Sequence, residues 1–337
     1  MTGSEPALGD HTAVPPILDD GALPPASDAA LRGQAMSRAL MRPFVRRLRL
    51  TPSGLRLLRV LTGAPNRLIR PVRGTTIRQV RSERVRGEWV TAPGVHGTGR
   101  ALLYLHGSAF TLLSASSHRG LVSRLSDRTG LPAFSVDYRL APEHPFPAAS
   151  DDVMAAYRYL LDNGIDASDV AVAGDSAGAF LAVDLTLQLA RRRAPLPAAV
   201  VLFSPLVDLT LQLAAAQEQL SPDPLVSARD CRRLVDLYVG GADRTDPRLT
   251  VTFDGIDQFP PTLIQTGGHE MLQADARHLH ALIRASGSRS YLQVWPGQGH
   301  VFQAMTSLPE ASAALREAAL FLAWTLRRTT GAGKGQL

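Results

Sequence analysis

A serine at position 176 stands in a setting that would make it a nucleophile. It lies at the centre of Gly174-Asp175-Ser176-Ala177-Gly178, and no other serine has glycine both two residues before and two residues after it. The apolar run VAVA precedes this stretch, and the segment AGAFLAVDL follows it. A strand that turns sharply into a helix exposes the serine Oγ and points helix N–H groups at the site. Ser176 is the predicted nucleophile; the simpler alternative is a serine that caps an ordinary helix.

A loop about 70 residues earlier could supply the hydrogen-bond donors that such a nucleophile requires. The stretch HGSAF directly follows the apolar run ALLYL. Acyl transfer needs backbone N–H donors at a preformed loop, and small residues let that backbone approach the substrate oxygen. We therefore predict an oxyanion hole at Gly107, Ser108 and Ala109, with the N–H group of Ala177 as a further donor.

The general base and its acid partner are expected on loops that follow later strands. His300 follows the run YLQVW and a glycine-containing loop, which would let the imidazole reach Ser176. Glu270 is the first acid after the run PTLIQT, and its carboxylate would orient the imidazole and stabilise the imidazolium. Asp275 remains the alternative acid, although its position at an expected helix start also fits an N-cap.

Short apolar runs alternate with amphipathic segments from about residue 76 onward. This alternation predicts an α/β fold, with a mostly parallel twisted sheet of about eight strands flanked by helices. Ligands bind beyond the carboxyl ends of the strands in such sheets. The expected strands are a hairpin within 76–91 and the runs 101–105, 132–136, 170–173, 198–203, 261–266 and 290–294, and the expected helices are 117–129, 151–161, 177–191, 274–285 and 310–327.

Three segments do not follow the alternation. Residues 1–30 are rich in Pro, Gly, Ala and Asp, which predicts a mobile tail. Residues 31–75 predict helices that prolines interrupt. Within the predicted core of 76–330, the stretch 207–258 is interpreted as an insertion over the strand ends, with a helical piece near 227–239.

The composition is that of a folded globular protein. Of the 337 residues, 45% are apolar and 20% are charged. The single cysteine, Cys231, permits no internal disulfide and favours a reducing compartment. Without a secretory signal pattern or an apolar run long enough to span a bilayer, we expect a soluble, cytoplasmic protein.

The net charge of +6 is distributed unevenly, with fifteen arginines and one acid between Arg32 and Arg86. No nucleic-acid recognition motif accompanies this excess, so we expect no nucleic-acid partner. The Arg-rich segment 36–86 indicates either a solvated basic face on a helix, the simpler interpretation, or weak association with an anionic membrane surface. The sequence also allows a homodimer.

These motifs together resemble the hormone-sensitive-lipase-like branch of the α/β-hydrolases, also called the HGGG or bacterial family IV esterases. The resemblance covers roughly residues 80–325 and rests on YLHGSAF, DYRLAPEHPFPAA, GDSAG, SPLVDL and VWPGQGHVF. It implies the α/β-hydrolase fold, a serine carboxylesterase without metal or organic cofactor, and a small-molecule ester substrate. It also implies a helical cap, formed by residues 31–75 and the insertion 207–258, that selects short- to medium-chain acyl groups.

One motif of this set carries three charged residues. Asp137, Arg139 and Glu143 belong to DYRLAPEHPFPAA and are interpreted as a buried charged turn below the site. The resemblance implies that this turn braces the oxyanion and nucleophile loops.

The sequence departs from the family pattern at two places. Ser108 and Ala109 stand where the family has glycine, so either their φ angles accept side chains or the loop is altered. Glu270 stands where the family usually has aspartate, and its additional methylene requires the backbone to lie further back.

Two other activities fit the same residues. Amide or N-acetyl hydrolysis would use the same Ser-His-acid triad, and a comparison of matched esters and amides would separate it from ester hydrolysis. A non-catalytic small-molecule receptor on this scaffold is the third alternative, which the presence of His300 in the expected loop disfavours.

Overall fold

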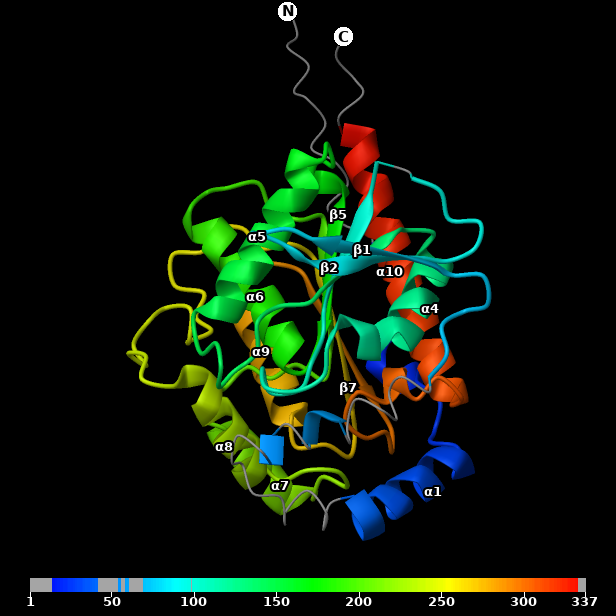
Figure 1. The fold of residues 1–337 in the computed structure, drawn as a ribbon. Coiled ribbons are helices and arrows are strands. Elements are labelled where there is room, and N and C mark those ends of the chain that lie inside the picture. Colours follow the sequence, from blue (N-terminus) through cyan, green and yellow to red (C-terminus); the bar gives the residue numbers. More distant parts are fainter. Residues whose placement is uncertain (1–13, 42–53, 56–57, 61–68, 98, 333–337) are drawn as a thin grey trace, which may run out of the picture.

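A single eight-stranded sheet forms the centre of the structure (Figure 1). The structure is a computed structural model, and it describes residues 14–41, 54–55, 58–60, 69–97 and 99–332. The strand order is β1-β2-β4-β3-β5-β6-β7-β8. Strands β1 and β2 form an antiparallel hairpin, β2 is antiparallel to β4, and all other neighbours are parallel. The predicted mostly parallel sheet is thus confirmed. The strands are β1 Thr76–Arg81, β2 Arg86–Thr91, β3 Ala101–Leu105, β4 Ala133–Val136, β5 Val170–Asp175, β6 Ala199–Phe203, β7 Thr262–Gly267 and β8 Ser290–Trp295.

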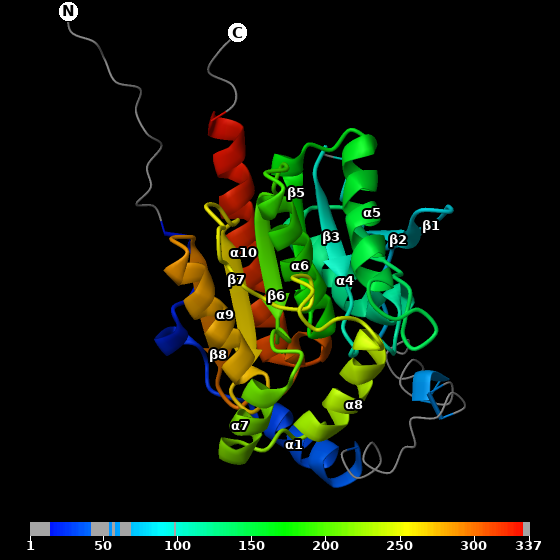
Figure 2. The same cartoon turned by 90° about the vertical axis from the view of Figure 1, so that its left-hand side faces the viewer.

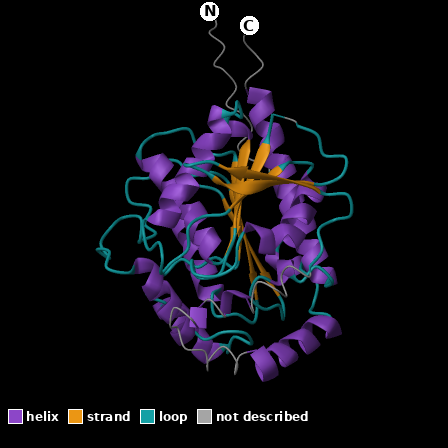
Figure 3. Cartoon of the chain, in the orientation of Figure 1, coloured by secondary structure: helices purple, strands orange, loops and turns teal. Residues whose placement is uncertain are grey.

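Helices cover both faces of this sheet (Figure 3). Alternate residues of the parallel strands enter two different cores: Leu103 and Val172 pack with α5, α6 and α9, whereas Leu102 and Ala171 pack with α4 and α10. Because both faces are covered, these strands are continuous apolar runs rather than alternating ones. The helices of the two layers are α4 Arg119–Thr129, α5 Ala148–Asp162, α6 Ala177–Arg191, α9 Gln273–Ala285 and α10 Pro309–Ala332.

Three helices lie beyond one end of the sheet, the end that carries the carboxyl termini of the parallel strands (Figures 1 and 2). They are α1 Asp28–Met36, α7 Gln212–Leu220 and α8 Ala228–Val239. The sequence predicted α8 but not α7. Helix α7 buries only Ala214, so its apolar periodicity is weak and the sequence pattern does not distinguish it from a loop.

The segment that leads into α1 contacts the core. The N–H of Leu18 donates to the Glu317 carboxylate of α10, and the N–H of Ser27, the N-cap of α1, donates to the Glu310 carboxylate of the same helix. Residues 14–30, the second part of the predicted tail, therefore have specific partners in the structure. Residues 1–13 lie outside the described residues.

The predicted helical region 31–75 is described only in part. Helix α1 continues into a π-helical turn, Ser37–Met41, and residues 54–55 and 58–60 are helical. Residues 42–53, 56–57 and 61–68, which carry many of the arginines, lie outside the described residues. None of the described helices combines the length and apolar character that crossing a membrane requires. The remaining short 3-10 turns are Asp20–Ala22, Ala115–His118, Ala167–Asp169 and Phe302–Ala304.

Candidate active site

Ser176 occupies the sharp turn between β5 and α6. Its backbone has φ 52° and ψ −119°, a conformation that a residue with a side chain rarely adopts. The turn is held because the N–H of Ser176 donates to the Phe203 carbonyl of β6 at 2.9 Å. The flanking glycines follow from close backbone packing: a Cβ on Gly174 would lie 2.6 Å from the Gly178 oxygen, and one on Gly178 would lie 2.1 Å from the Leu105 oxygen.

Ser176, His300 and Glu270 lie in one hydrogen-bonded row. His300 Nε2 is 3.1 Å from Ser176 Oγ, and His300 Nδ1 is 2.8 Å from Glu270 Oε2. The other oxygen of Glu270 accepts from the Gly267 N–H at 2.9 Å and from the Thr266 hydroxyl. The Glu270 carboxylate is fully buried, so three donors hold it in one orientation.

Backbone contacts join the loops that carry the acid and the histidine. The N–H groups of Gly268 and His269 donate to the carbonyls of Trp295 and Gln298, each at 2.8 Å. The N–H of Val301, directly after His300, donates to Ser204 Oγ at 3.0 Å. These contacts fix the distance between Glu270 and the imidazole.

The surroundings of His300 raise its pKa above the usual value of 6.5. Burial lowers the pKa, but the hydrogen bond and charge of Glu270, together with the charges of Asp223 and Asp175, outweigh it. The imidazolium that forms when His300 takes a proton is therefore stabilised by three carboxylates.

Asp275, the alternative acid, lies elsewhere. Helix α9 begins at Gln273 with Leu272 at its N-cap, so the N-cap interpretation of Asp275 is wrong. One oxygen of its buried carboxylate accepts the N–H groups of Val207 and Asp208, each at 2.9 Å. Asp275 forms no hydrogen bond or ion pair with His300 in the described structure. Burial raises its pKa to about 7.

The HGSA loop keeps a glycine-like backbone although two of its residues carry side chains. Ser108 has φ 100° and Ala109 has φ 51°. Ser108 Oγ donates to the Leu112 carbonyl within the loop. The N–H groups of Ser108, Ala109 and Ala177 form no hydrogen bond with any described residue, so they remain open to a ligand oxygen.

Gly107, a predicted residue of the oxyanion hole, is not one of the open donors of this loop. Its N–H donates to Asp175 Oδ1 at 3.1 Å, so it does not point at a substrate oxygen in this arrangement. A Cβ at this position would lie 2.2 Å from Asp175 Oδ2 and 3.0 Å from Ser176 Cβ. Gly107 therefore allows the oxyanion loop to approach the nucleophile turn.

Gly107→Ala is expected to lower the free energy of unfolding by about 1 to 3 kcal/mol and to reduce kcat, because the added methyl overlaps Asp175. Gly241→Ala is the matched control, since nothing lies within 4 Å of a Cβ there. Denaturant unfolding and ester hydrolysis measure both effects. Equal stability of the two variants would contradict the contact between Gly107 and Asp175.

A buried polar cluster that the sequence did not predict supports Gly107 and Ser176 from below. Asp175 accepts from the Tyr104 hydroxyl at 2.7 Å and pairs with His118 Nε2 at 3.5 Å. Burial lowers the pKa of His118, but the Asp175 charge outweighs this and the pKa is raised. His106 stacks against Tyr138 and His118, and burial lowers its pKa to about 4, so it is neutral near pH 7. Tyr104, His106, Tyr138 and Asp175 all lie in motifs of the sequence, whereas His118 does not, and no motif indicated that these residues meet.

The charged turn of DYRLAPEHPFPAA is half-exposed rather than buried. The side chains of Asp137, Arg139 and Glu143 are 41%, 40% and 49% exposed, so the interpretation as a buried turn is wrong. Arg59 links this turn to the oxyanion loop, because its guanidinium pairs with Glu143 and donates to the Thr111 carbonyl at 2.9 Å.

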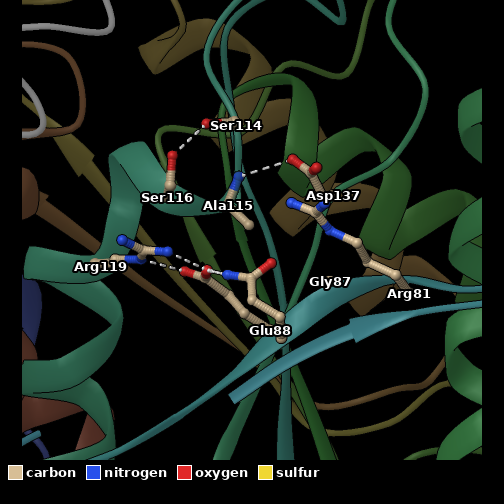
Figure 4. Close-up of a pocket in the computed structure, with 9 residues that line it drawn as sticks. Arg81, Gly87, Glu88, Ser114, Ala115, Ser116, Arg119 and Asp137 are labelled. Carbon is tan, nitrogen blue, oxygen red and sulfur yellow. Dashed lines mark hydrogen bonds and ion pairs between the residues drawn. The ribbon is translucent and has the colours of Figure 1, made fainter. Parts of the chain in front are cut away.

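A polar cavity of about 560 Å³ lies apart from Ser176, between the β1–β2 hairpin and the turn Ala115–His118 (Figure 4). Two of its acidic groups already have partners: Arg119 binds both oxygens of Glu88 at 2.8 and 2.6 Å, and Asp137 accepts from the Ala115 N–H. None of Ser176, His300 and Glu270 lines it. The cavity is therefore separate from the hydrogen-bonded row that contains Ser176.

The family described as alpha/beta hydrolase fold matches residues 102–304 of this chain. This chain belongs to that family. An acetyl-hydrolase of Streptomyces hygroscopicus is 39% identical over 247 residues, which is 73% of this chain and 81% of the relative. An esterase of Acinetobacter venetianus is 34% identical over the same shares of the two chains.

Solved structures place this α/β-hydrolase in the hormone-sensitive-lipase-like branch, as the motifs predicted. An esterase from the bacterial hormone-sensitive lipase family superposes with a TM-score of 0.81 at 32% identity, covering 89% of this chain and 99% of that chain. The structure of EstE5 superposes with a TM-score of 0.82 at 31% identity, covering 90% of this chain and 100% of that chain.

Proposed function

We propose that Ser176, His300 and Glu270 are the catalytic triad of this serine carboxylesterase. The observation that carries the proposal is the hydrogen-bonded row from Ser176 Oγ through the imidazole to Glu270. The open N–H groups of Ser108, Ala109 and Ala177 would form the oxyanion hole beside it.

The reaction follows from the position of each proton. His300 Nε2 takes the proton from Ser176 Oγ as the oxygen attacks the ester carbonyl, and the same proton then passes to the leaving alcohol. Water, deprotonated by His300, attacks the acyl-enzyme and releases the acid and the free serine. Glu270 keeps Nδ1 protonated and stabilises the imidazolium throughout. Each oxyanion donor contributes on the order of 3 kcal/mol to the transition state.

Two observations support a short acyl group in the substrate. The side chains of Ser108 and Ala109 occupy space that glycine would leave open, and Phe110 of the same loop stacks on Tyr238 of α8 with ring centroids 3.8 Å apart. An ethyl acetate hydrolase of Pseudomonas putida is 36% identical over 223 residues. We therefore propose acetate to butyrate esters as the preferred substrate class.

The test is a series of p-nitrophenyl esters from acetate to octanoate, with the matched anilides as amide substrates. The expected result is a maximum of kcat/KM between acetate and butyrate and much slower amide hydrolysis. Faster hydrolysis of the acetanilide would favour an amide or N-acetyl hydrolase. The absence of turnover with every ester would contradict the proposed activity.

Two partner proposals concern surfaces outside the site. The Arg-rich segment 36–86, which is described only in part, is proposed to associate weakly with anionic membranes. Sedimentation with phosphatidylserine vesicles tests this, and no binding at low salt would remove the proposal. A homodimer is the second proposal, and a monomer mass in sedimentation velocity would contradict it.

A further inference from the structure

Asp223 is a buried carboxylate in the connection between α7 and α8, within the insertion over the strand ends. Its Oδ1 accepts the N–H groups of Leu225 and Val226 at 2.8 and 3.1 Å, which shapes the turn that precedes α8. Its Oδ2 accepts the N–H of Met271 at 3.1 Å. Asp223 thus joins the insertion to the residue directly after Glu270.

The same turn also approaches the histidine loop. A Cβ on Gly299, the residue before His300, would lie 3.6 Å from the Pro224 ring. The turn that begins at Asp223 therefore packs against both loops whose separation sets the Glu270–His300 contact. Nothing in the turn-rich sequence of the insertion predicted this.

We propose that Asp223 is a positioning residue that couples the insertion to the triad, by holding the acid loop through Met271 and by placing a second negative charge near His300. The proposal rests on the proposed function, because it assigns Asp223 a part in the step in which His300 becomes an imidazolium.

The electrostatic surroundings of Asp223 support this assignment. No Arg or Lys of the described residues forms an ion pair with it. Burial raises the pKa of Asp223, the nearby Glu270 also raises it, and His300 and the N–H groups of Leu225 and Met271 lower it. Asp223 in turn raises the pKa of His300, together with Glu270 and Asp175. Burial and the Asp223 charge also raise the pKa of Cys231 of α8.

A buried carboxylate without a permanent cation lowers the stability of the folded protein, but it can stabilise a positive charge that forms beside it during the reaction. The imidazolium of His300 is such a charge, because it forms when the proton leaves Ser176 and disappears when the alcohol departs. A second carboxylate near it stabilises the transition state more than the resting enzyme.

The decisive variant is Asp223→Asn, which removes the charge and keeps one oxygen acceptor, so that its NH₂ group faces either the Met271 N–H or the N–H groups of Leu225 and Val226. We expect kcat to fall about tenfold, which is a loss of about 1.4 kcal/mol, with KM nearly unchanged. In the pH profile of kcat/KM, the acidic limb reports the titration of His300. This limb should move to lower pH by roughly half a unit, because one partly screened charge no longer raises the pKa of His300.

Asp275→Asn is the matched control. It removes another buried carboxylate that accepts two backbone N–H groups from the insertion, but one whose charge is not among those that raise the pKa of His300. Its acidic limb should coincide with that of the wild type. Asp223→Glu, which keeps the charge, should return the limb toward the wild-type position.

A purely structural role for Asp223 would give a different result. Asp223→Asn would then lower the melting temperature while the acidic limb stayed in place, and that outcome would overturn the proposal. If the Asn variant does not fold, Asp223→Ser replaces it, because serine is smaller and neutral and can also accept an N–H. The melting temperature and the acidic limb of this variant then distinguish the same two outcomes. An active Ser176→Ala variant would instead contradict the triad itself, so the two failures are distinguishable.

Discussion

Ser176→Ala is expected to lower kcat for p-nitrophenyl acetate by about 10⁵-fold or more, because no other group can form the acyl-enzyme bond. The residual rate should come from the oxyanion donors and substrate binding alone, which do not require the serine oxygen. The fold should survive, since alanine keeps the Cβ and the backbone bond from residue 176 to the Phe203 carbonyl does not involve the side chain.

Ser288→Ala provides the control, because Ser288 lies between α9 and β8 and its hydroxyl contacts only Ser286 among the described residues. This variant should retain wild-type kcat. A phosphonate ester should label one serine of the wild type and none of the Ser176→Ala variant, as measured by intact mass. Full labelling of the alanine variant would mean that the nucleophile is another residue.

Glu270→Gln is expected to lower kcat by about 10³- to 10⁴-fold. The amide has nearly the same shape, but its NH₂ group cannot hold the protonated Nδ1 of His300 as the carboxylate does at 2.8 Å. The imidazole then favours the tautomer that cannot take the proton of Ser176. A single-turnover measurement of acylation tests this directly.

Asp275→Asn should change kcat less than threefold, because Asp275 contacts the backbone of Val207 and Asp208 rather than His300. A larger loss of kcat from this variant than from Glu270→Gln would reverse the assignment of the acid. The two substitutions therefore decide between residues that lie five positions apart in the sequence.

The stability of Asp275→Asn should also depend on pH differently from that of the wild type. The folded-state pKa of Asp275, about 7, lies above its ordinary value of 3.8, so folding takes up a proton between these pH values. The wild type therefore loses this contribution as pH rises from about 4 to 7. Asp275→Asn should be more stable than the wild type at pH 8, by on the order of 2 kcal/mol, with a smaller difference at pH 5. If the wild type and Asp275→Asn had equal denaturation midpoints at pH 5 and also at pH 8, the raised pKa of Asp275 would be contradicted.

The local motifs predicted much of the site because their constraints act within a few residues. Ser176 could be assigned from GDSAG since both glycines are required by backbone atoms of the turn itself and of the neighbouring strand. The strands β3 and β5 were predicted because sheets covered on both faces require continuous apolar runs. The position of His300 after a predicted strand followed from the same alternation.

Long-range contacts decided the rest. The sequence left Glu270 and Asp275 open because the direction of a side chain at the start of a helix depends on how that helix packs, and α9 turns Asp275 toward Val207. Gly107 was assigned to the oxyanion loop, but no local pattern indicated that Asp175, 68 positions away, accepts its N–H. Asp223 had no local signal, because its importance lies in a contact with Met271, 48 positions away.

By itself, the sequence determined the fold class, and it predicted the turn with Ser176, the proposed oxyanion loop and the histidine loop, since each depends on short-range backbone geometry and apolar periodicity. Only the tertiary structure decided which acid faces His300, which N–H groups of the HGSA loop remain open, and how the insertion reaches the acid loop. These features depend on the relative placement of segments far apart in the chain, which packing sets and which no local pattern records.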